Sequence, residues 1–217
     1  MNPKASITYL ILIIIPLFLG CRGPIKEENI DNAGASTFSS EHGANEEYSI
    51  DTKKSVVTWK GSMLIGSDTN TGYVSISEGE LIIKNGQLID GTAEIDMNTI
   101  ADKRHKSDNE LVEHLKSSDF FDVQKFPTST ITAIKVTSIN GKNKNVTGNL
   151  TIKGITNPVS FPAKIEIKDG IVQMNGKLVI DRTKWNVRYK SGKFFDLLPD
   201  QTMSDSIEFT VNIIAKN

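Results

Sequence analysis

The chain has 217 residues, and its 25 basic and 26 acidic side chains leave a formal net charge of −1 at pH 7. This length suits one domain of ordinary size with additional terminal segments. The balanced charge creates no long-range field that would favour nucleic acid or an anionic membrane surface, so we expect no nucleic-acid partner.

The first residues predict a secretory signal. Lys4 supplies a positive charge, and residues 9–19 form an apolar run that is interrupted by Pro16 and too short to span a bilayer. The run ends in Phe-Leu-Gly-Cys, which resembles a bacterial lipobox with phenylalanine where leucine is usual. We interpret residues 1–20 as a lipoprotein signal peptide, with an ordinary signal peptide as the alternative.

Cys21 is the only cysteine in the chain. A lone thiol in an exported protein is a liability, and its place at the end of a signal sequence is best explained by lipid attachment. Two or more acyl chains on one residue would anchor the protein stably, because each buried methylene contributes about 0.8 kcal/mol. We therefore expect an exported protein that is lipid-anchored in the cell envelope, at the periplasmic or surface face of the outer membrane.

Residues 21–46 are rich in Gly, Ser, Ala, Asn and Glu, which predicts a lipidated, flexible tether. Within it, the tripeptide Lys26-Glu27-Glu28 resembles signals that send lipoproteins to the cell surface in some Gram-negative groups. A solvated charge cluster explains it equally well. The folded domain is then expected over residues 47–217.

From Tyr48 onward, apolar and polar residues alternate with the period of a β-strand. The alternation is cleanest over residues 146–152, 159–167, 172–180 and 207–213, as half-buried antiparallel strands require. Earlier strands are predicted near residues 56–62, 72–77, 79–84, 92–97 and 128–136.

Three dipeptides between these strands predict tight hairpin turns: Asn85-Gly86, Asn140-Gly141 and Asp169-Gly170. The predicted fold is therefore all-β, an antiparallel up-and-down meander of about eight strands. Closure into a barrel would remove the exposed edges, and about eight strands leave an interior that side chains fill or one slender ligand occupies. The sequence leaves both possibilities open.

One short helix is predicted before residue 127, where a proline ends it. Ser107 and Glu110 have the spacing of a capping box, and Leu111 and Leu115 lie one turn apart. An aromatic cluster follows, with Phe120, Phe121 and Phe126.

The residues that usually carry catalysis or bind metal form no recognisable set. His42, His105 and His114 lack ligand spacing, and no nucleophile elbow, phosphate loop or dinucleotide fingerprint occurs. Asp119 and Asp122 are interpreted as turn caps. We therefore expect neither an enzyme nor a bound cofactor or metal.

Two long runs resemble a known family. Residues 114–128, HLKSSDFFDVQKFPT, are similar to the central signature of the YceI-like family, HLRSxDFFDxxxFPT, and follow the Ile-Asp-rich strand EIDMNTI. Residues 146–162, VTGNLTIKGITNPVSFP, are similar to its second signature, VxGxLTIxGxTxPV. The resemblance covers residues 47–216 and implies a lipocalin-like barrel that holds a polyisoprenoid or similar apolar chain in its interior.

The resemblance favours an apolar pocket over a plain core for the aromatic clusters, which could form the lid and mouth of a cavity. The residues expected to line this pocket are Trp59, Phe120, Phe121, Phe126, Leu150, Ile152, Phe161, Trp185, Phe194 and Phe195. The expected partner is a long-chain isoprenoid or quinone-like lipid, which the barrel would sequester or carry. The rival hypothesis is a filled barrel that serves as an interaction or adhesion module on the outer membrane.

The chain departs from the family in one loop. Many relatives carry a histidine in a GSHxG stretch, whereas residues 66–70 here read GSDTN, with Asp68 in its place. Headgroup preference is therefore expected to differ while chain binding persists. Because no basic cluster lies in the matching loops, we expect selection by chain length and flexibility more than by headgroup.

Overall fold

A computed structural model of the chain describes residues 44–66, 68–104 and 109–217. The predicted signal peptide, Cys21 and almost all of the predicted tether lie outside the described residues. His42, His105 and Ser107 also lie outside them.

The described residues form nine strands and two short helices. The strands are β1 (Glu46–Ile50), β2 (Val56–Ser62), β3 (Thr69–Lys84), β4 (Gln87–Asp102), β5 (Thr128–Asn140), β6 (Asn143–Ile152), β7 (Ile155–Lys168), β8 (Ile171–Asp181) and β9 (Ser206–Lys216). The helices are α1 (Glu110–Lys116) and the single 3-10 turn η1 (Arg182–Trp185). Neither helix is long and apolar enough to cross a membrane.

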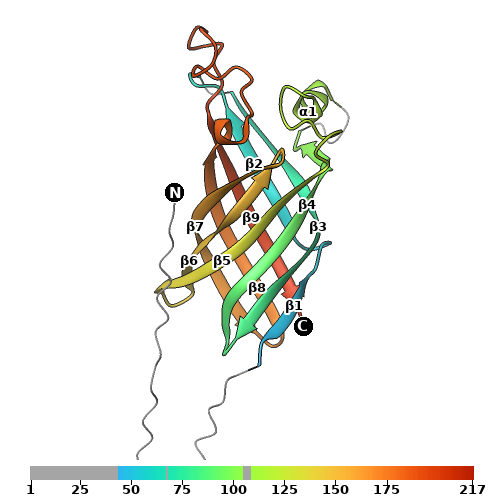
Figure 1. Cartoon of the computed structure of the whole chain (residues 1–217), viewed down its shortest axis with the longest axis vertical. Coiled ribbons are helices and arrows are strands. Elements are labelled where there is room, and N and C mark those ends of the chain that lie inside the picture. The colour runs from blue at the N-terminus through green and yellow to red at the C-terminus, as the bar shows by residue number, and fades with distance from the viewer. Residues whose placement is uncertain (1–43, 67, 105–108) are drawn as a thin grey trace, which may run out of the picture. The chain divides into compact units, whose positions relative to one another are not determined.

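Strands β2 to β9 form a closed antiparallel barrel. Each pairs with its neighbour along the chain, and five residue pairs between β2 and β9, from Val56↔Asn212 to Lys60↔Glu208, close the sheet. Figure 1 shows α1 and the long loop before β9 at one end of this barrel, called here the upper end, and β1 near the other, lower end. The predicted eight-stranded up-and-down barrel is confirmed.

β1 continues the position of β2 toward the lower end of the barrel. It pairs with β3 through Tyr48↔Leu81 and with β9 through Ile50↔Ala215. A turn over residues 51–55 separates β1 from β2, and there the Ser55 hydroxyl donates to the Ile214 carbonyl (3.2 Å) and accepts from its N–H (3.0 Å). This serine therefore satisfies backbone groups of β9 where the ladder is interrupted.

The predicted strands 72–77 and 79–84 are one strand, β3. Ile76 pairs with Ile95 and Glu78 with Glu94, so Ser77 is an extra, bulged residue. The bulge moves the buried positions from even to odd residue numbers, and the sequence prediction took this change for a strand boundary. The predicted strand 56–62 coincides with β2, and the remaining six lie within β4 to β9.

The hairpin turns follow the predicted dipeptides and add one more. Residues 85–86 and 169–170 have positive φ at both positions, as type I′ turns require. Lys153 and Gly154 adopt the same geometry (φ 50° and 70°) between β6 and β7. This turn escaped prediction because a lysine in the left-handed region is uncommon.

The helix α1 begins two residues later than the predicted capping box implies. Its N-cap is Asn109, whose side-chain oxygen accepts a hydrogen bond from the Val112 N–H (2.9 Å). The N-cap was predicted at Ser107, which lies outside the described residues, and the described helix is capped by Asn109, nearer its apolar face. That face buries Val112 and Leu115.

One close contact places the indole of Trp59 against the backbone of β3. A Cβ atom on Gly72 would lie 1.9 Å from the Ala101 carbonyl oxygen and 2.3 Å from Cζ2 of Trp59, so the indole lies directly against the glycine backbone. Only glycine fits at this position of the strand.

We predict that Gly72→Ala lowers the free energy of unfolding by about 1–3 kcal/mol, the usual cost of overpacking. The measurement is urea denaturation followed by tryptophan fluorescence. Gly61→Ala is the matched control, since no atom lies within 4 Å of a Cβ built on Gly61 in the neighbouring strand. Equal midpoints for the two variants would contradict the packing described.

Candidate ligand-binding cavity

The barrel interior is filled at its lower end and hollow above. The lower part holds the buried side chains of Tyr48, Ile83, Leu88, Ile165, Val172 and Ala215. Above them lies a cavity of about 290 Å³, close to the lower limit of the roughly 300–1,000 Å³ typical of ligand pockets. A uniformly filled barrel, which the interaction-module hypothesis assumes, is therefore not what the chain forms.

The floor of the cavity is apolar. It consists of inward-facing residues on five strands, Ile76, Ala93, Phe161, Met174 and Ile213. Their side chains offer neither a donor nor an acceptor, apart from the weakly accepting thioether of Met174. An occupant of this part must itself be apolar.

The mouth of the cavity lies at the upper end. Lining residues with partial exposure there include Met63, Asn70, His114, Tyr189 and Met203. They come from the end of β2, the start of β3, the helix and the loop before β9. The helix and that loop thus border an opening between the cavity and solvent.

Aromatic rings pack beneath the helix. Phe120 is 2% exposed, and its ring centroid lies 5.3 Å from that of His114 and 5.5 Å from that of Tyr189. The rings of His114 and Tyr189 are 4.3 Å apart in an edge-on arrangement. Phe121 lies beside Phe120 and also lines the cavity. These rings form the cover that the sequence predicted for part of the pocket.

Six of the ten predicted pocket residues line the cavity: Trp59, Phe120, Phe121, Leu150, Ile152 and Phe161. The structure thus brings together residues from β2, β6, β7 and the segment after α1. Their contact with a ligand remains a prediction.

The other four predicted pocket residues do not line the cavity. Trp185 is buried, and its indole N–H donates to the Leu150 carbonyl (3.0 Å), which fastens η1 to β6. Phe126 packs against Gly154 of the β6–β7 turn. Phe194 and Phe195 are 44% and 51% exposed on the loop before β9. Their aromatic character suggested a pocket, but packing away from the cavity explains Trp185 and Phe126, and Phe194 and Phe195 are exposed on a loop.

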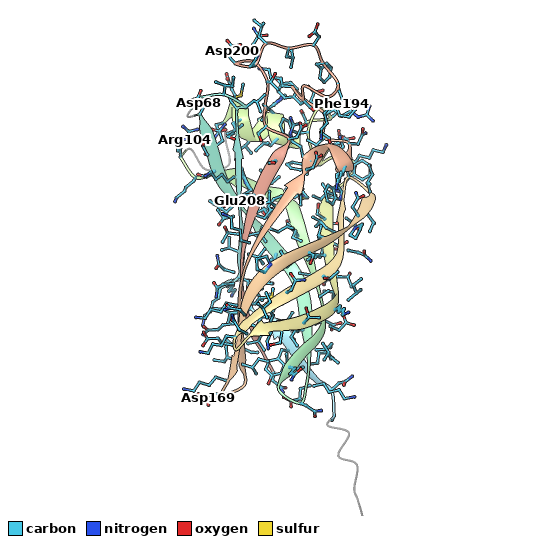
Figure 2. All side chains as sticks on the ribbon, turned by 90° about the vertical axis from the view of Figure 1, so that its left-hand side faces the viewer. Asp68, Arg104, Asp169, Phe194, Asp200 and Glu208 are labelled. Carbon is cyan, nitrogen blue, oxygen red and sulfur yellow. The ribbon has the colours of Figure 1, made fainter. Side chains whose placement is uncertain are left out.

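Asp68, the residue that replaces the family histidine, is exposed at the upper end (Figure 2). Its carbonyl oxygen accepts from the Met63 N–H (3.2 Å), and its side chain does not line the cavity. Any influence on a headgroup would therefore act outside the cavity wall.

The sequence prediction missed a buried charge at the upper end. Arg182 is 1% exposed, and its guanidinium donates to the carbonyls of Ser204 (3.0 Å) and Val187 (2.9 Å). One of its nitrogens lies 3.4 Å from the Asp205 carboxylate. Burial lowers the pKa of Arg182, and the nearby carboxylates of Asp205 and Asp181 oppose that shift.

The charges around Arg182 hold the loop before β9 in place. Burial alone would raise the pKa of Asp181, yet hydrogen bonds from Lys193 and Thr183 lower it to about 2. Lys193 also lies 3.4 Å from Asp205. Continuing the inward alternation of β8 from Ile180 would have located Arg182, but a charged residue at a strand end is more often solvated.

Three buried polar atoms of lining residues have no hydrogen-bond partner among the described residues. They are Trp59 Nε1, His114 Nε2 and Ser129 Oγ. An unsatisfied buried group costs about 1–3 kcal/mol, so three around one cavity are unusual. None belongs to the floor, and the cavity is therefore apolar at its base and partly polar nearer its mouth.

A closed antiparallel barrel with an apolar internal cavity defines a lipocalin-like binding protein fold. Residues 48–215 match the YceI-like domain, and the chain belongs to this family. The two signatures seen in the sequence fall within the matched residues, so the resemblance stated from them is confirmed.

Relatives of known name match a short part of the chain. A UPF0312 protein of Pseudomonas aeruginosa is 46% identical over 52 residues, and Protein YceI of Salmonella arizonae is 44% identical over 52 residues. Each match spans 24% of this chain and 27% of the relative, so the chain covers about a quarter of the length of these proteins.

Two solved structures share the fold over most of the chain. Burkholderia cenocepacia BcnA has a TM-score of 0.62 at 21% identity and covers 77% of this chain and 99% of its own. A polyisoprenoid binding domain from Saccharophagus degradans, implicated in plant cell wall breakdown, has a TM-score of 0.57 at 12% identity and covers 78% and 97%. At these identities the likeness establishes the fold.

Replacing Arg182 by Met should lower the free energy of unfolding by about 3–5 kcal/mol, because it leaves the loop carbonyls and Asp205 without their buried cation. Chemical denaturation provides the measurement. Lys177→Met, which removes an exposed ion pair with Glu208, is the control and should cost at most about 1 kcal/mol. A loss from Arg182→Met no larger than that of the control would show that the guanidinium does not hold the loop.

Proposed function

We propose that the barrel binds a long apolar lipid of the polyisoprenoid class in its cavity and sequesters or carries it without catalysing a reaction. The observation that carries this proposal is the apolar floor above a filled lower end, with a mouth at the upper end. A slender chain fits such a dead-end cavity. The shared fold with the polyisoprenoid binding domain of Saccharophagus degradans supports the same ligand class.

Burial of the chain would supply most of the affinity. A lipid chain gains about 0.8 kcal/mol per buried methylene, so each five-carbon isoprene unit contributes roughly 3–4 kcal/mol before ordering costs. A few buried units suffice for tight binding.

The unpaired polar atoms favour a ligand whose head carries an oxygen acceptor. Trp59 Nε1 can only donate a hydrogen bond, whereas Ser129 Oγ and His114 Nε2 can donate or accept. A hydroxyl or quinone-like carbonyl near these atoms, with the apolar tail at the floor, satisfies both parts of the cavity. A phosphate gains little from Arg182, because carbonyls and Asp205 already occupy that guanidinium.

The lining residues support a binding role over catalysis. His114 is surrounded by the rings of Phe120 and Tyr189, and it makes no hydrogen bond to Ser129. His114 and Ser129 therefore do not form the hydrogen-bonded base–nucleophile pair that covalent catalysis uses. The described residues also contain no group of three side chains that could hold a metal ion.

We further propose that the protein acts in the cell envelope as a lipoprotein anchored through Cys21. The support is the lipobox-like sequence, which ends at the only cysteine of the chain.

The cavity proposal is tested by filling the floor. Ala93→Leu should weaken binding of a fluorescent polyprenol by about 30-fold, because three added carbons displace roughly 2 kcal/mol of buried ligand chain. Thr92→Leu adds the same side chain to the adjacent exposed position and should bind normally. Equal affinities, with both variants folded by circular dichroism, would place the ligand elsewhere.

The anchor proposal is tested by metabolic labelling with an alkyne fatty acid. The unchanged protein should incorporate the label, and Cys21→Ser should lose it because no other thiol can be acylated at a lipobox. Phe18→Leu, which restores the usual lipobox residue, should label at least as well as the unchanged protein. A protein that takes up no label, or a serine variant that still does, would contradict lipidation at this residue.

A further inference from the structure

Exposed apolar side chains gather on two loops at the upper end. Of the eleven large hydrophobic residues that are exposed in the described chain, five lie on the β2–β3 loop and on the loop before β9. They are Leu64 (58%), Ile65 (60%), Phe194 (44%), Phe195 (51%) and Leu198 (62%). The other six are distributed over strands β3, β4, β5, β7 and β8. Figure 2 shows Phe194 at the upper end of the barrel, well away from Asp169 at the lower end.

The two loops form one platform. The Leu64 N–H donates to the Thr202 carbonyl (2.8 Å), and the Ser204 N–H donates to the Ser62 carbonyl (3.0 Å). A β-bridge joins Met63 to Met203 between these bonds. Residues 62–64 and 202–204 are therefore held side by side, which joins the two loops into one surface.

The platform is ordered by internal contacts. The N–H groups of Phe194 and Phe195 donate to the carbonyl of the fully buried Ser191 (3.0 and 3.1 Å). The guanidinium of Arg188 lies 4.5 Å above the Phe194 ring. A group of apolar residues held in exposed positions is typical of an interaction surface.

The platform is continuous with the cavity. Met63 and Met203, which join the two loops, also line the mouth, as does Tyr189 of the same long loop. A lipid chain that enters the cavity thus passes beside the exposed apolar residues. This continuity points to a lipid bilayer as the occupant, since a bilayer is the reservoir of such chains.

The charge of the platform suits a bilayer of any headgroup. The loop before β9 carries three basic residues, Arg188, Lys190 and Lys193, and three acidic ones, Asp196, Asp200 and Asp205. With Asp68 of the β2–β3 loop, the platform carries a formal net charge of only −1, so contact would depend on apolar insertion more than on anionic lipid.

The length of the N-terminal segment permits this orientation. The 24 residues between Cys21 and Glu46 allow a separation of at most roughly 80–90 Å, whereas the 16 residues of β3 span only about 50 Å. The segment from Cys21 to Glu46 is therefore long enough to run along the outside of the barrel. The protein can be anchored at Cys21 while the upper end of the barrel faces the same membrane.

From these observations we propose that the two loops dock the barrel on a bilayer through Leu64, Ile65, Phe194, Phe195 and Leu198, so that the cavity mouth takes up its lipid directly from the membrane. The docking surface is inferred from the exposed loops alone. The uptake of lipid rests on the proposed function.

The docking is tested with a single environment-sensitive fluorophore. In the full chain with Cys21→Ser, which removes the only native thiol, the label is attached through Leu198→Cys or through the control Ile139→Cys, which is equally exposed (58%) on β5. With phosphatidylcholine vesicles, the label at 198 should shift to the blue and be quenched by spin-labelled lipid at both low and high salt, and the label at 139 should not respond. No response at 198, or equal responses at both positions, would overturn the docking.

A second measurement separates docking from lipid binding. Changing Leu64, Ile65 and Phe194 to Ser should slow uptake of a fluorescent polyprenol from vesicles at least tenfold while leaving its affinity from detergent solution unchanged. Ile134→Ser combined with Ile139→Ser and Val179→Ser, three exposed strand residues, is the control and should transfer normally. Normal uptake in the loop variant would overturn membrane uptake through the platform. Insertion at 198 without any polyprenol affinity would leave the docking intact and contradict the proposed function alone.

Discussion

Closure of the sheet between β2 and β9 is the interaction on which the rest of the structure depends. Five paired residues on each strand remove the two edges that an open meander would expose. Closure also fixes which residues face inward and, with eight strands, how wide the interior is. At this width, the size of the inward-facing side chains determines whether a given part of the barrel is filled or hollow.

The filling differs along the barrel. At the lower end, where β1 completes the wall, Tyr48, Leu88 and Val172 fill the interior. Nearer the upper end the interior is not filled, and the small side chain of Ala93 contributes to the cavity there. The apolar cavity opens toward the end that carries the helix and the loop before β9 (Figure 1). The guanidinium of Arg182 holds the loop from inside. The apolar residues Phe194, Phe195 and Leu198 of the same loop are exposed to solvent.

The strand pattern was predictable because successive side chains of a β-strand point to opposite faces, and only one face of the barrel wall is buried. The predicted strands, the three dipeptide turns and the short helix were therefore found, whereas the Ser77 bulge and the Lys153-Gly154 turn were missed. Alternation also explains why inward strand residues such as Trp59, Leu150 and Phe161 line the cavity as predicted.

The aromatic clusters were less reliable guides to the site. Trp185 satisfies its N–H with the Leu150 carbonyl outside the cavity, and Phe194 faces solvent, although both are aromatic residues in irregular segments. Long-range contacts determine such positions, and no local pattern records them. The alternation of β8 points Arg182 inward, but the partners that allow its burial include the Ser204 carbonyl at the other end of the loop, which no local pattern records.

Native mass spectrometry of the protein purified without added lipid, followed by organic extraction, tests the central claim most directly. A hollow, apolar dead-end cavity predicts that the folded protein carries one bound molecule, and that the extract contains a polyisoprenoid whose homologues differ by one isoprene unit. Detection of the empty mass alone, together with no saturable binding of polyprenyl probes to the folded protein, would contradict the account.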